Sequence, residues 1–312
     1  MKILITGASG FVGKYLTRLL LKHGHKIIAM GINNGCFFEQ TNITAYDINI
    51  LDYPAILECI KKEQPDGIIH LAAISNVPIS WQQPAQTIDV NVIGTINVLK
   101  ALIENNSKTK FLNIGSSDEY GLAAKTGIPL TEDVLCQPQN PYSISKYCAE
   151  QMVMQLGIKN GVTVIQMRSF NHFGPGQENG FVTSDFASQI AAIEKGEQNP
   201  IIKVGDLDVY RDFLFVTDVV EAYASLMEKD VESGIYNICS GYARKIEEVL
   251  NTLVDLSYED IKIEKDLKKM RAAEVPFFIG NCAKLKKATG WQPHYDFKRG
   301  MEEVLNYWRD KR

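Results

Sequence analysis

The chain has 312 residues and a formal net charge of −4 at pH 7. This length is enough for one large or two modest domains, and an apolar content of 45% is typical of a globular protein. The slight negative charge argues against a basic field that would attract nucleic acid or an anionic membrane, so neither is an expected partner. No apolar run approaches the ~20 residues that span a bilayer.

The cysteines and histidines do not indicate a metal site. Six cysteines are scattered without a C-x-x-C pair, namely Cys36, Cys59, Cys136, Cys148, Cys239 and Cys282. The five histidines show no ligand spacing either, and His70, at the end of a strand candidate, is expected to be structural. The sequence starts as a strand, "MKILITG", with no pattern of a secretory signal. We therefore expect reduced thiols, no metal and a cytoplasmic location.

Short apolar runs alternate with amphipathic stretches over the first 170 residues. The stretches at 12–24 and 91–106 carry apolar residues at helical spacing. The strand candidates are 2–7, 26–31, 43–48, 67–73, 110–117 and 162–170. Strands that are apolar on both faces and alternate with helices predict an α/β fold with a Rossmann-type, doubly wound parallel sheet.

The pattern changes after residue 170. A turn-rich segment precedes a helix candidate at 181–197, and the chain then continues with a short strand, a strand–helix pair, another strand and a closing amphipathic helix. We expect a smaller, mixed α/β C-terminal substrate domain. The predicted boundaries are 1–170, with a return segment at about 207–240, for the dinucleotide-binding domain, and 171–206 with 241–312 for the substrate domain.

The first strand candidate runs into three glycines, Gly7, Gly10 and Gly13, in "LITGASGFVG". Glycines between a strand and a helix allow a tight turn and a close approach of backbone N–H groups to a pyrophosphate. The helix N-terminus adds a partial positive charge. The spacing is G-x-x-G-x-x-G, and its strand–turn–helix context predicts dinucleotide binding rather than a plain tight turn.

The second strand ends in "IIAMGINNG", which places Gly31 where an acid would bind the ribose 2′-hydroxyl of NAD. A 2′-phosphate would meet no repulsion there, so the sequence favours NADP, with NAD also possible. Asn33 can donate hydrogen bonds to the cofactor or simply form a turn. Asp47, in "YDI" with Ile48, stands where such folds place an acid near the adenine.

A reactive constellation follows in "GSSDEY" (115–120) and "YSISK" (142–146). Tyr142 and Lys146 are four residues apart and therefore share a helical face. A phenol with a pKa near ~10 is a poor proton donor at neutral pH, and a nearby ammonium is expected to lower that pKa. A serine hydroxyl that bonds to a substrate carbonyl would complete an acid–base site.

The sequence resembles the extended short-chain dehydrogenase/reductase family, in the branch that acts on nucleoside-diphosphate sugars. The resemblance runs nearly end to end, through "TGASGFVG", "HLAA", "NVIGTINVL", "GSSDEYG", "PYSISK", "RSFNHFGPGQ", "RDFLFVTDV", "YNICSG" and "GWQP". Within the branch, "FNHFGPGQ", "GFVTSDFASQIAAIE" and "RAAEVP" are most similar to GDP-4-dehydro-6-deoxy-mannose reductases.

The resemblance implies a role for individual residues. Ser116, Tyr142 and Lys146 would form the catalytic triad, with Ser117 as a rival hydroxyl. The residues implied around the cofactor are Gly7, Gly10, Phe11, Val12, Gly13, Asn33, Asp47, Ile48, Leu71, Ala72, Ala73, Asn91, Tyr142 and Lys146. Those implied near the sugar nucleotide are Ser117, Asp118, Asn171, Arg211, Arg271 and Glu274, and His172 is a further candidate.

Asp118 and Glu119 raise the question of a second activity. Dehydratases of this branch carry a base two residues before the tyrosine of "YG", a place that Asp118 takes here. Aspartate is shorter than glutamate by about 1.5 Å, enough to cost ~100-fold in a proton transfer. The two acids can equally cap the turn or point to solvent.

The expected function is NAD(P)H-dependent reduction of a ketone at C4 of a nucleoside-diphosphate 6-deoxyhexose, in deoxysugar biosynthesis. A 4,6-dehydratase or 4-epimerase with tightly bound NAD(P) is the alternative, and a non-catalytic dinucleotide sensor is a lesser one. The resemblance also implies a homodimer, paired through helices at about 87–105 and 142–158.

Overall fold

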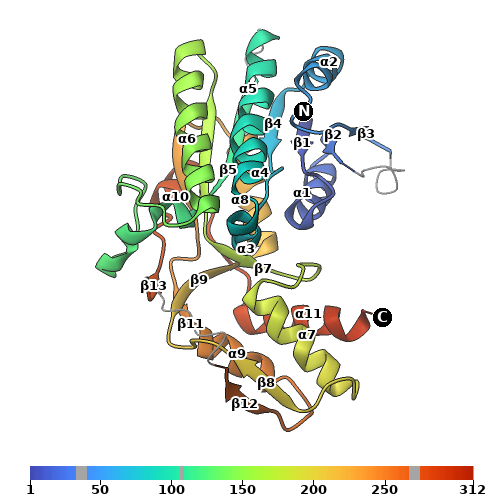
Figure 1. Ribbon diagram of the computed structural model, residues 1–312. Helices are drawn as coiled ribbons and strands as arrows, with labels where there is room; N and C mark the ends of the chain where they lie inside the picture. Colours follow the sequence, from blue (N-terminus) through green and yellow to red (C-terminus); the bar gives the residue numbers. More distant parts are fainter. Residues whose placement is uncertain (33–40, 106–108, 267–274, 312) are drawn as a thin grey trace.

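The computed structural model describes residues 1–32, 41–105, 109–266 and 275–311, which form two lobes (Figure 1). Seven parallel strands build the sheet of the upper lobe. In spatial order they are β10 (Gly234–Ile238), β6 (Val164–Ser169), β5 (Lys110–Ser116), β4 (Gly67–His70), β1 (Lys2–Thr6), β2 (Lys26–Gly31) and β3 (Ile43–Asp47). The order reverses at β1, which confirms the doubly wound, Rossmann-type α/β fold.

Helices cover both faces of this sheet, as its apolar strands require. One face packs against α1 (Phe11–Lys22) and α8 (Val216–Glu228). The other packs against α2 (Tyr53–Glu63), α5 (Thr95–Glu104) and α6 (Pro141–Asn160). Shorter elements join them: α3 (Val77–Gln82), α4 (Pro84–Ile88), a π-helical turn η1 (Asp89–Gly94), and the 3₁₀ turns η2 (Ser117–Tyr120) and η3 (Leu122–Thr126).

In its described residues the lower lobe contains two small sheets and three helices around its own apolar core. One sheet joins β7 (Asn171–Phe173), β9 (Tyr210–Phe215), β11 (Ala243–Lys245) and β13 (Phe277–Phe278). The other pairs β8 (Ile201–Val204) with β12 (Lys262–Lys265). The helices are α7 (Val182–Glu194), α9 (Ile246–Val254) and α11 (Phe297–Asp310). Among the described residues, no helix combines the length and apolar character needed to cross a membrane.

The chain returns to the upper lobe more than once. α8 packs on α1, β10 joins the edge of the large sheet, and α10 (Ala283–Thr289) packs against β10. The expected return segment at 207–240 needs one correction, because β9 pairs with β7, β11 and β13 rather than with the large sheet. An apolar strand pattern indicates burial but does not say which sheet the strand joins.

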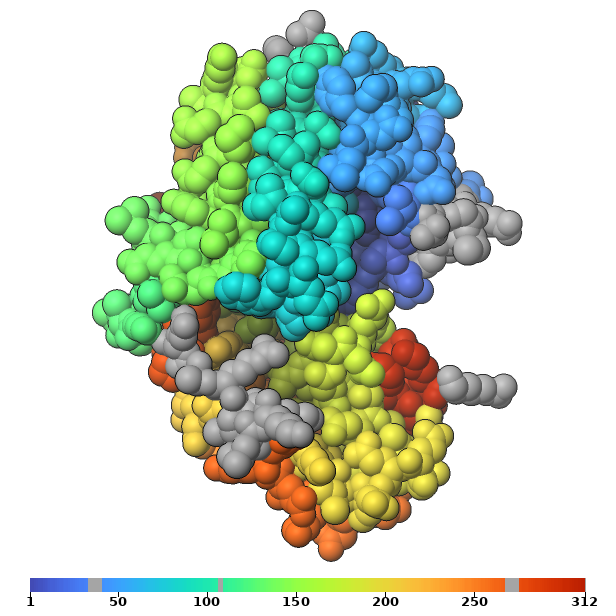
Figure 2. Space-filling view, viewed as in Figure 1, coloured from blue at the N-terminus to red at the C-terminus, as the bar shows by residue number. Residues whose placement is uncertain are grey.

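Asp212, in β9, ties the strands at the junction of the lobes. Its buried carboxylate accepts hydrogen bonds from Ser240 N (2.8 Å), Ser240 Oγ (2.6 Å), Gly241 N (2.9 Å) and Gly280 N (3.2 Å). Ser240 and Gly241 follow β10, and Gly280 follows β13. One side chain therefore satisfies the backbone at the ends of strands in both lobes. Figure 2 shows the surface drawn inward where the lobes meet, beneath the teal helices and above the yellow-green α7.

Candidate active site

The predicted site residues converge on the carboxyl ends of β1, β4 and β5, at the edge where the strand order reverses. In open parallel sheets this crevice is where ligands bind, because loops diverge from it in opposite directions. The glycine turn follows β1, Leu71–Ala73 follow β4, and Ser116 ends β5 with Ser117 and Asp118 directly after it. Residues distant in sequence are thus brought to one edge.

The glycine turn is built so closely that side chains would not fit. Gly7 has φ +68°, and a Cβ there would lie 2.9 Å from Ala72 N. A Cβ on Gly13 would lie 2.4 Å from Gly7 O and 2.6 Å from Ala8 O. Gly10 caps α1 without a side chain, so the first N–H groups of the helix remain open to a ligand. A cradle of this kind has room for the pyrophosphate of a dinucleotide.

Replacement of Gly13 by Ala should therefore damage both the fold and cofactor binding. The clashing atoms are backbone and can yield only by moving α1 away from β1, so we expect a loss of about 3 kcal/mol in the free energy of unfolding. Urea unfolding and NADPH titration by fluorescence measure the two effects. Gly10→Ala is the matched comparison, since its Cβ would approach Gly7 O only to 3.2 Å. Equal effects of the two substitutions would contradict the packing argument.

The other predicted cofactor residues line the same edge. Phe11 and Val12 begin α1, and the Phe11 ring stacks on His172, with centroids 6.2 Å apart. Asp47 ends β3 beside Gly31 of β2, followed by Ile48. Asn33 lies outside the described residues.

Asn91 is buried in the π-helical turn. Its amide bonds both the N–H and the carbonyl of Ile74, at 2.8 and 3.0 Å, and donates to Ser145 Oγ at 2.9 Å. It thereby ties the loop after β4 to the helix that carries Tyr142 and Lys146.

His70 is structural, as expected. Its ring lies between Thr6 Oγ1 (2.8 Å from Nδ1) and Thr95 Oγ1 (2.9 Å from Nε2), and it is 2% exposed. Burial, with a smaller contribution from Lys146, lowers the pKa of His70 to about 3. The folded protein therefore holds this ring neutral near neutral pH.

This burial predicts an acid-sensitive stability. Since the pKa of His70 is lower in the folded state than the ~6.5 of an unfolded chain, stability is complete above pH 6.5 and falls as the pH falls toward 3. Between pH 7 and pH 5 the contribution of His70 amounts to about 2 kcal/mol. In urea unfolding, His70→Gln should lose less stability than wild type over this interval. Parallel slopes for the two proteins would refute the assignment.

Ser116, Tyr142 and Lys146 meet between β5 and the first turns of α6. Asn140 caps α6 by accepting from Ser143 N, and Tyr142 N donates to Ser80 Oγ at 3.1 Å. These bonds fix the start of the helix, and the spacing of four places Tyr142 and Lys146 on its buried face. Ser116 Oγ accepts from Asp118 N at 3.2 Å, which leaves the hydroxyl proton free to be donated.

The electrostatics of the pair differ from the sequence prediction. Burial, with Asp118 nearby, raises the pKa of Tyr142, and a hydrogen bond with Ser116 opposes that rise. The Nζ of Lys146 donates to Ile114 O at 2.8 Å, and burial lowers the pKa of Lys146 to about 8. The predicted direction of the tyrosine pKa shift is therefore wrong, because burial of the phenol outweighs any lowering by the lysine.

Two of the predicted substrate residues, Asp118 and Arg211, come from different lobes and lie near each other. Burial raises the pKa of Asp118 while Arg211, from β9, opposes the rise, so these charges confront each other across the lobes. Arg211 also donates to Val275 O at 3.2 Å. Ser117 is buried, and Asn171 is exposed at the start of β7. Arg271 and Glu274 lie outside the described residues.

Glu119 was expected to cap a turn or face solvent. It does accept from Ser116 N, at 2.7 Å, but it is fully buried, together with Glu150 and Arg168. Sequence reasoning missed this charged cluster. The signal in the sequence that could have indicated it was the presence of Glu119, Glu150 and Arg168 in otherwise apolar segments.

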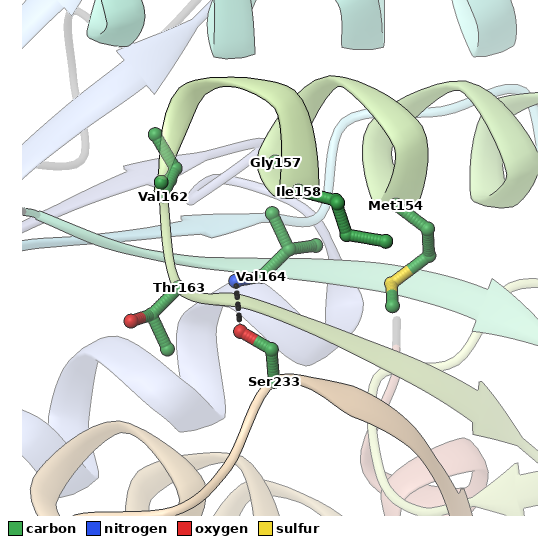
Figure 3. Close-up of a pocket in the computed structure, with 8 residues that line it drawn as sticks. Met154, Gly157, Ile158, Val162, Thr163, Val164 and Ser233 are labelled. Carbon is green, nitrogen blue, oxygen red and sulfur yellow. Dashed lines mark hydrogen bonds between the residues drawn. The ribbon is translucent and has the colours of Figure 1, made fainter.

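A cavity of about 260 Å³ lies at the opposite end of α6 (Figure 3). Met154, Ile158, Val164 and Ser233 are among its lining residues, and Val164 N donates to Ser233 Oγ at 3.2 Å. Its lining residues carry no charge and no group able to move a proton at neutral pH. This hollow has no part in the chemistry of the triad.

Known proteins resemble this chain over nearly its whole length. A family model described as GDP-mannose 4,6 dehydratase matches residues 4–304. The chain is 37% identical over 310 residues to the GDP-6-deoxy-D-mannose reductase of Pseudomonas aeruginosa, covering 99% of this chain and 98% of the relative. It is 32% identical to the GDP-6-deoxy-D-talose 4-dehydrogenase of Aggregatibacter actinomycetemcomitans, covering 98% and 97%.

Solved structures resemble the whole chain. The protein RMD from Pseudomonas aeruginosa, solved in complex with NADPH, has a TM-score of 0.87 at 36% identity and covers 99% of this chain and 98% of its own. The UDP-glucose 4-epimerase of Thermotoga maritima, solved with UDP-glucose, has a TM-score of 0.87 at 26% identity and covers 99% of both chains. The architecture is thus shared by enzymes that differ in chemistry.

Proposed function

The chain belongs to the GDP-mannose 4,6 dehydratase family, and from that premise we propose that it reduces the C4 ketone of a GDP-linked 4-keto-6-deoxyhexose with NADPH. One observation carries the proposal. Ser116, Tyr142 and Lys146 come together near a glycine turn that is too tight to accept side chains at Gly7 and Gly13. Similarity to a GDP-6-deoxy-D-mannose reductase and to a structure holding NADPH supports the sugar and the cofactor.

The chain's own residues divide the work of the reaction. Bound NADPH supplies the hydride. Tyr142 donates a proton to the oxygen of the ketone as it becomes an alcohol, and Ser116 hydrogen-bonds that oxygen. Burial excludes water, which strengthens both interactions. Lys146, whose Nζ is fixed on Ile114 O at 2.8 Å, would hold the ribose of the cofactor, and Gly7, Gly10 and Gly13 would make room for its pyrophosphate.

A pH dependence follows from the buried lysine. The pKa of Lys146 is lowered to about 8, so its charge is present below pH 8 and is lost as the pH rises through that value. The kcat/KM for NADPH, which reports on the free enzyme, should therefore fall about tenfold for each pH unit above 8. A profile that stays flat to pH 10, with the protein still folded by circular dichroism, would refute this role.

A 4,6-dehydratase is the second candidate, and Asp118 is the observation that favours it. Its carboxyl group lies near Arg211 of the other lobe, where a proton could be removed from a bound sugar. Its side chain is nevertheless shorter than that of the dehydratase base, and Ser117 replaces the acid that one dehydratase group carries. A sensor without activity would not need the tyrosine–lysine pair.

The deciding experiment supplies the purified protein with NADPH and GDP-4-keto-6-deoxymannose. We expect NADPH oxidation, followed at its absorbance band, and a GDP-6-deoxyhexose product by mass spectrometry. If the protein instead consumes GDP-mannose with no net NADPH oxidation, it is a dehydratase. UDP- and dTDP-linked 4-keto sugars serve as matched controls for the base.

We further propose a homodimer in the cytoplasm. Ile144, Met152 and Ile158 on α6 and Ile93 on the adjoining turn are 40–70% exposed, and a second copy could cover them. The five described cysteines are free thiols, in keeping with a reducing compartment. Light scattering at micromolar concentration tests the dimer, and a monomer would contradict it.

A further inference from the structure

Three charged side chains are buried directly beneath the carboxyl end of β5. Glu119 and Glu150 are fully buried and Arg168 is 3% exposed. Arg168 makes a two-pronged contact with Glu150, from Nε to Oε2 at 2.9 Å and from Nη2 to Oε1 at 2.6 Å. Its Nε lies 3.8 Å from Glu119 Oε2. The guanidinium is thus already committed to Glu150 when Glu119 approaches it.

Two carboxyl groups pair with one guanidinium in this cluster, whereas the nearby Lys146 donates to Ile114 O and forms no ion pair with either acid. Full ionisation would leave a surplus negative charge in a dry interior, a state that proteins avoid by retaining a proton. Glu119 Oε2 accepts no hydrogen bond among the described residues, and Arg168 Nε lies 3.8 Å from it, so a negative charge on that oxygen would be poorly compensated. Burial, and then the charge of Glu150, raises the pKa of Glu119 well above its ordinary value, in agreement with this geometry.

The cluster reaches the catalytic centre through Ser116. Glu119 Oε1 accepts the backbone N–H of Ser116 at 2.7 Å, whereas the hydroxyl of Ser116 faces Tyr142. A simple capping interaction would explain this one bond but not the burial of Glu119 with two further charges. We propose that Glu119 is a positioning residue, a carboxylic acid that shares one proton with Glu150 and holds Ser116 in place for the ketone.

A charge on Glu119 would change the pKa values of the titratable groups around it. The titratable groups that face it are Glu150, Lys146, Tyr142 and Tyr147 from α6, Arg168 from β6 and Cys136 from the loop before α6. A permanent charge on Glu119 would favour the proton on both Lys146 and Tyr142, and so would weaken Tyr142 as an acid. Sharing the proton with Glu150 avoids this.

The role of Glu119 rests on the proposed reductase activity, and the experiment below distinguishes failure of the one from failure of the other. Glu119→Met, similar in volume but unable to accept from Ser116, should lower kcat about 10–30-fold with KM nearly unchanged. Glu119→Gln retains an acceptor for Ser116 and a donor for Glu150, and should recover most of that loss. In a Ser116→Ala background, Glu119→Met should lower kcat no further, because its effect passes through Ser116.

The outcomes are distinct. If Glu119→Met lowers kcat by the same factor with and without Ser116→Ala, or if Glu119→Gln is as damaging as Glu119→Met, the proposal is wrong. Infrared difference spectra of wild type against Glu119→Gln report the proton without any turnover. A protonated carboxyl C=O band should disappear in the variant, and absence of that band in wild type overturns the proton sharing. Wild type that never oxidises NADPH, yet shows the band, refutes the reductase alone.

Discussion

Tyr142→Phe is expected to lower kcat for ketone reduction by about 10³-fold while the affinity for NADPH changes little. The substitution removes one hydroxyl and keeps a ring that is 9% exposed, so the packing of α6 against β5 is preserved. General acid catalysis by a positioned side chain contributes 10²–10⁴-fold, which sets the size of the effect. Ser116 can still bond the oxygen, but no group then supplies its proton.

Stopped-flow measurement of NADPH oxidation, with NADPH binding followed by fluorescence, checks this prediction. Tyr147→Phe is the matched control, because Tyr147 lies on the same helix and is only partly buried. We expect the control to retain kcat within about threefold, as substitutions away from the reacting atoms do. A Tyr142→Phe protein as active as the control would transfer the role of proton donor to another group.

Asp212→Ala is expected to cause the largest loss of stability. The substitution leaves three backbone N–H groups and one hydroxyl at the lobe junction without their acceptor. A buried donor left unpaired costs roughly 1–3 kcal/mol, partly relieved where water enters, so the total should reach about 4 kcal/mol. Because β9 also carries Arg211, the loosened strand should weaken substrate binding as well.

Asp208→Ala provides the comparison for urea unfolding. Asp208 is an exposed neighbour that pairs with Lys245 at 2.7 Å, and an exposed ion pair contributes little to stability. Its unfolding midpoint should stay close to that of wild type, whereas that of Asp212→Ala should fall markedly. Coinciding midpoints for the two variants would show that the junction does not depend on this carboxylate.

Much of the upper lobe could be predicted from local sequence. Apolar runs of four to seven residues separated by amphipathic helices specify a parallel sheet, and each of the six predicted strands is found. The glycine turn and the Tyr142–Lys146 spacing were readable because their chemistry depends on short intervals along the chain. In such a motif the relative positions of the functional residues follow from their spacing in the sequence alone.

Contacts between distant segments were not predictable in the same way. The pairing of β9 with the small sheet, and the burial of Glu119 against Glu150 and Arg168, depend on strands far apart in sequence. An acid in a turn gives the same sequence pattern whether it faces water or a guanidinium. The predicted direction of the Tyr142 pKa shift was wrong for the same reason, since it depends on how deeply the phenol is buried and on where Lys146 points.

The passage of the chain back and forth between the lobes also bears on how new specificities can arise. Since α8, β10 and α10 belong to one lobe while β9, β11 and α11 belong to the other, no single cut in the gene yields two self-contained halves. Exchanging whole modules between relatives would break both cores. Selectivity for a different sugar must therefore change residue by residue on a connected scaffold, and a laboratory library should diversify the gap between the lobes rather than recombine fragments.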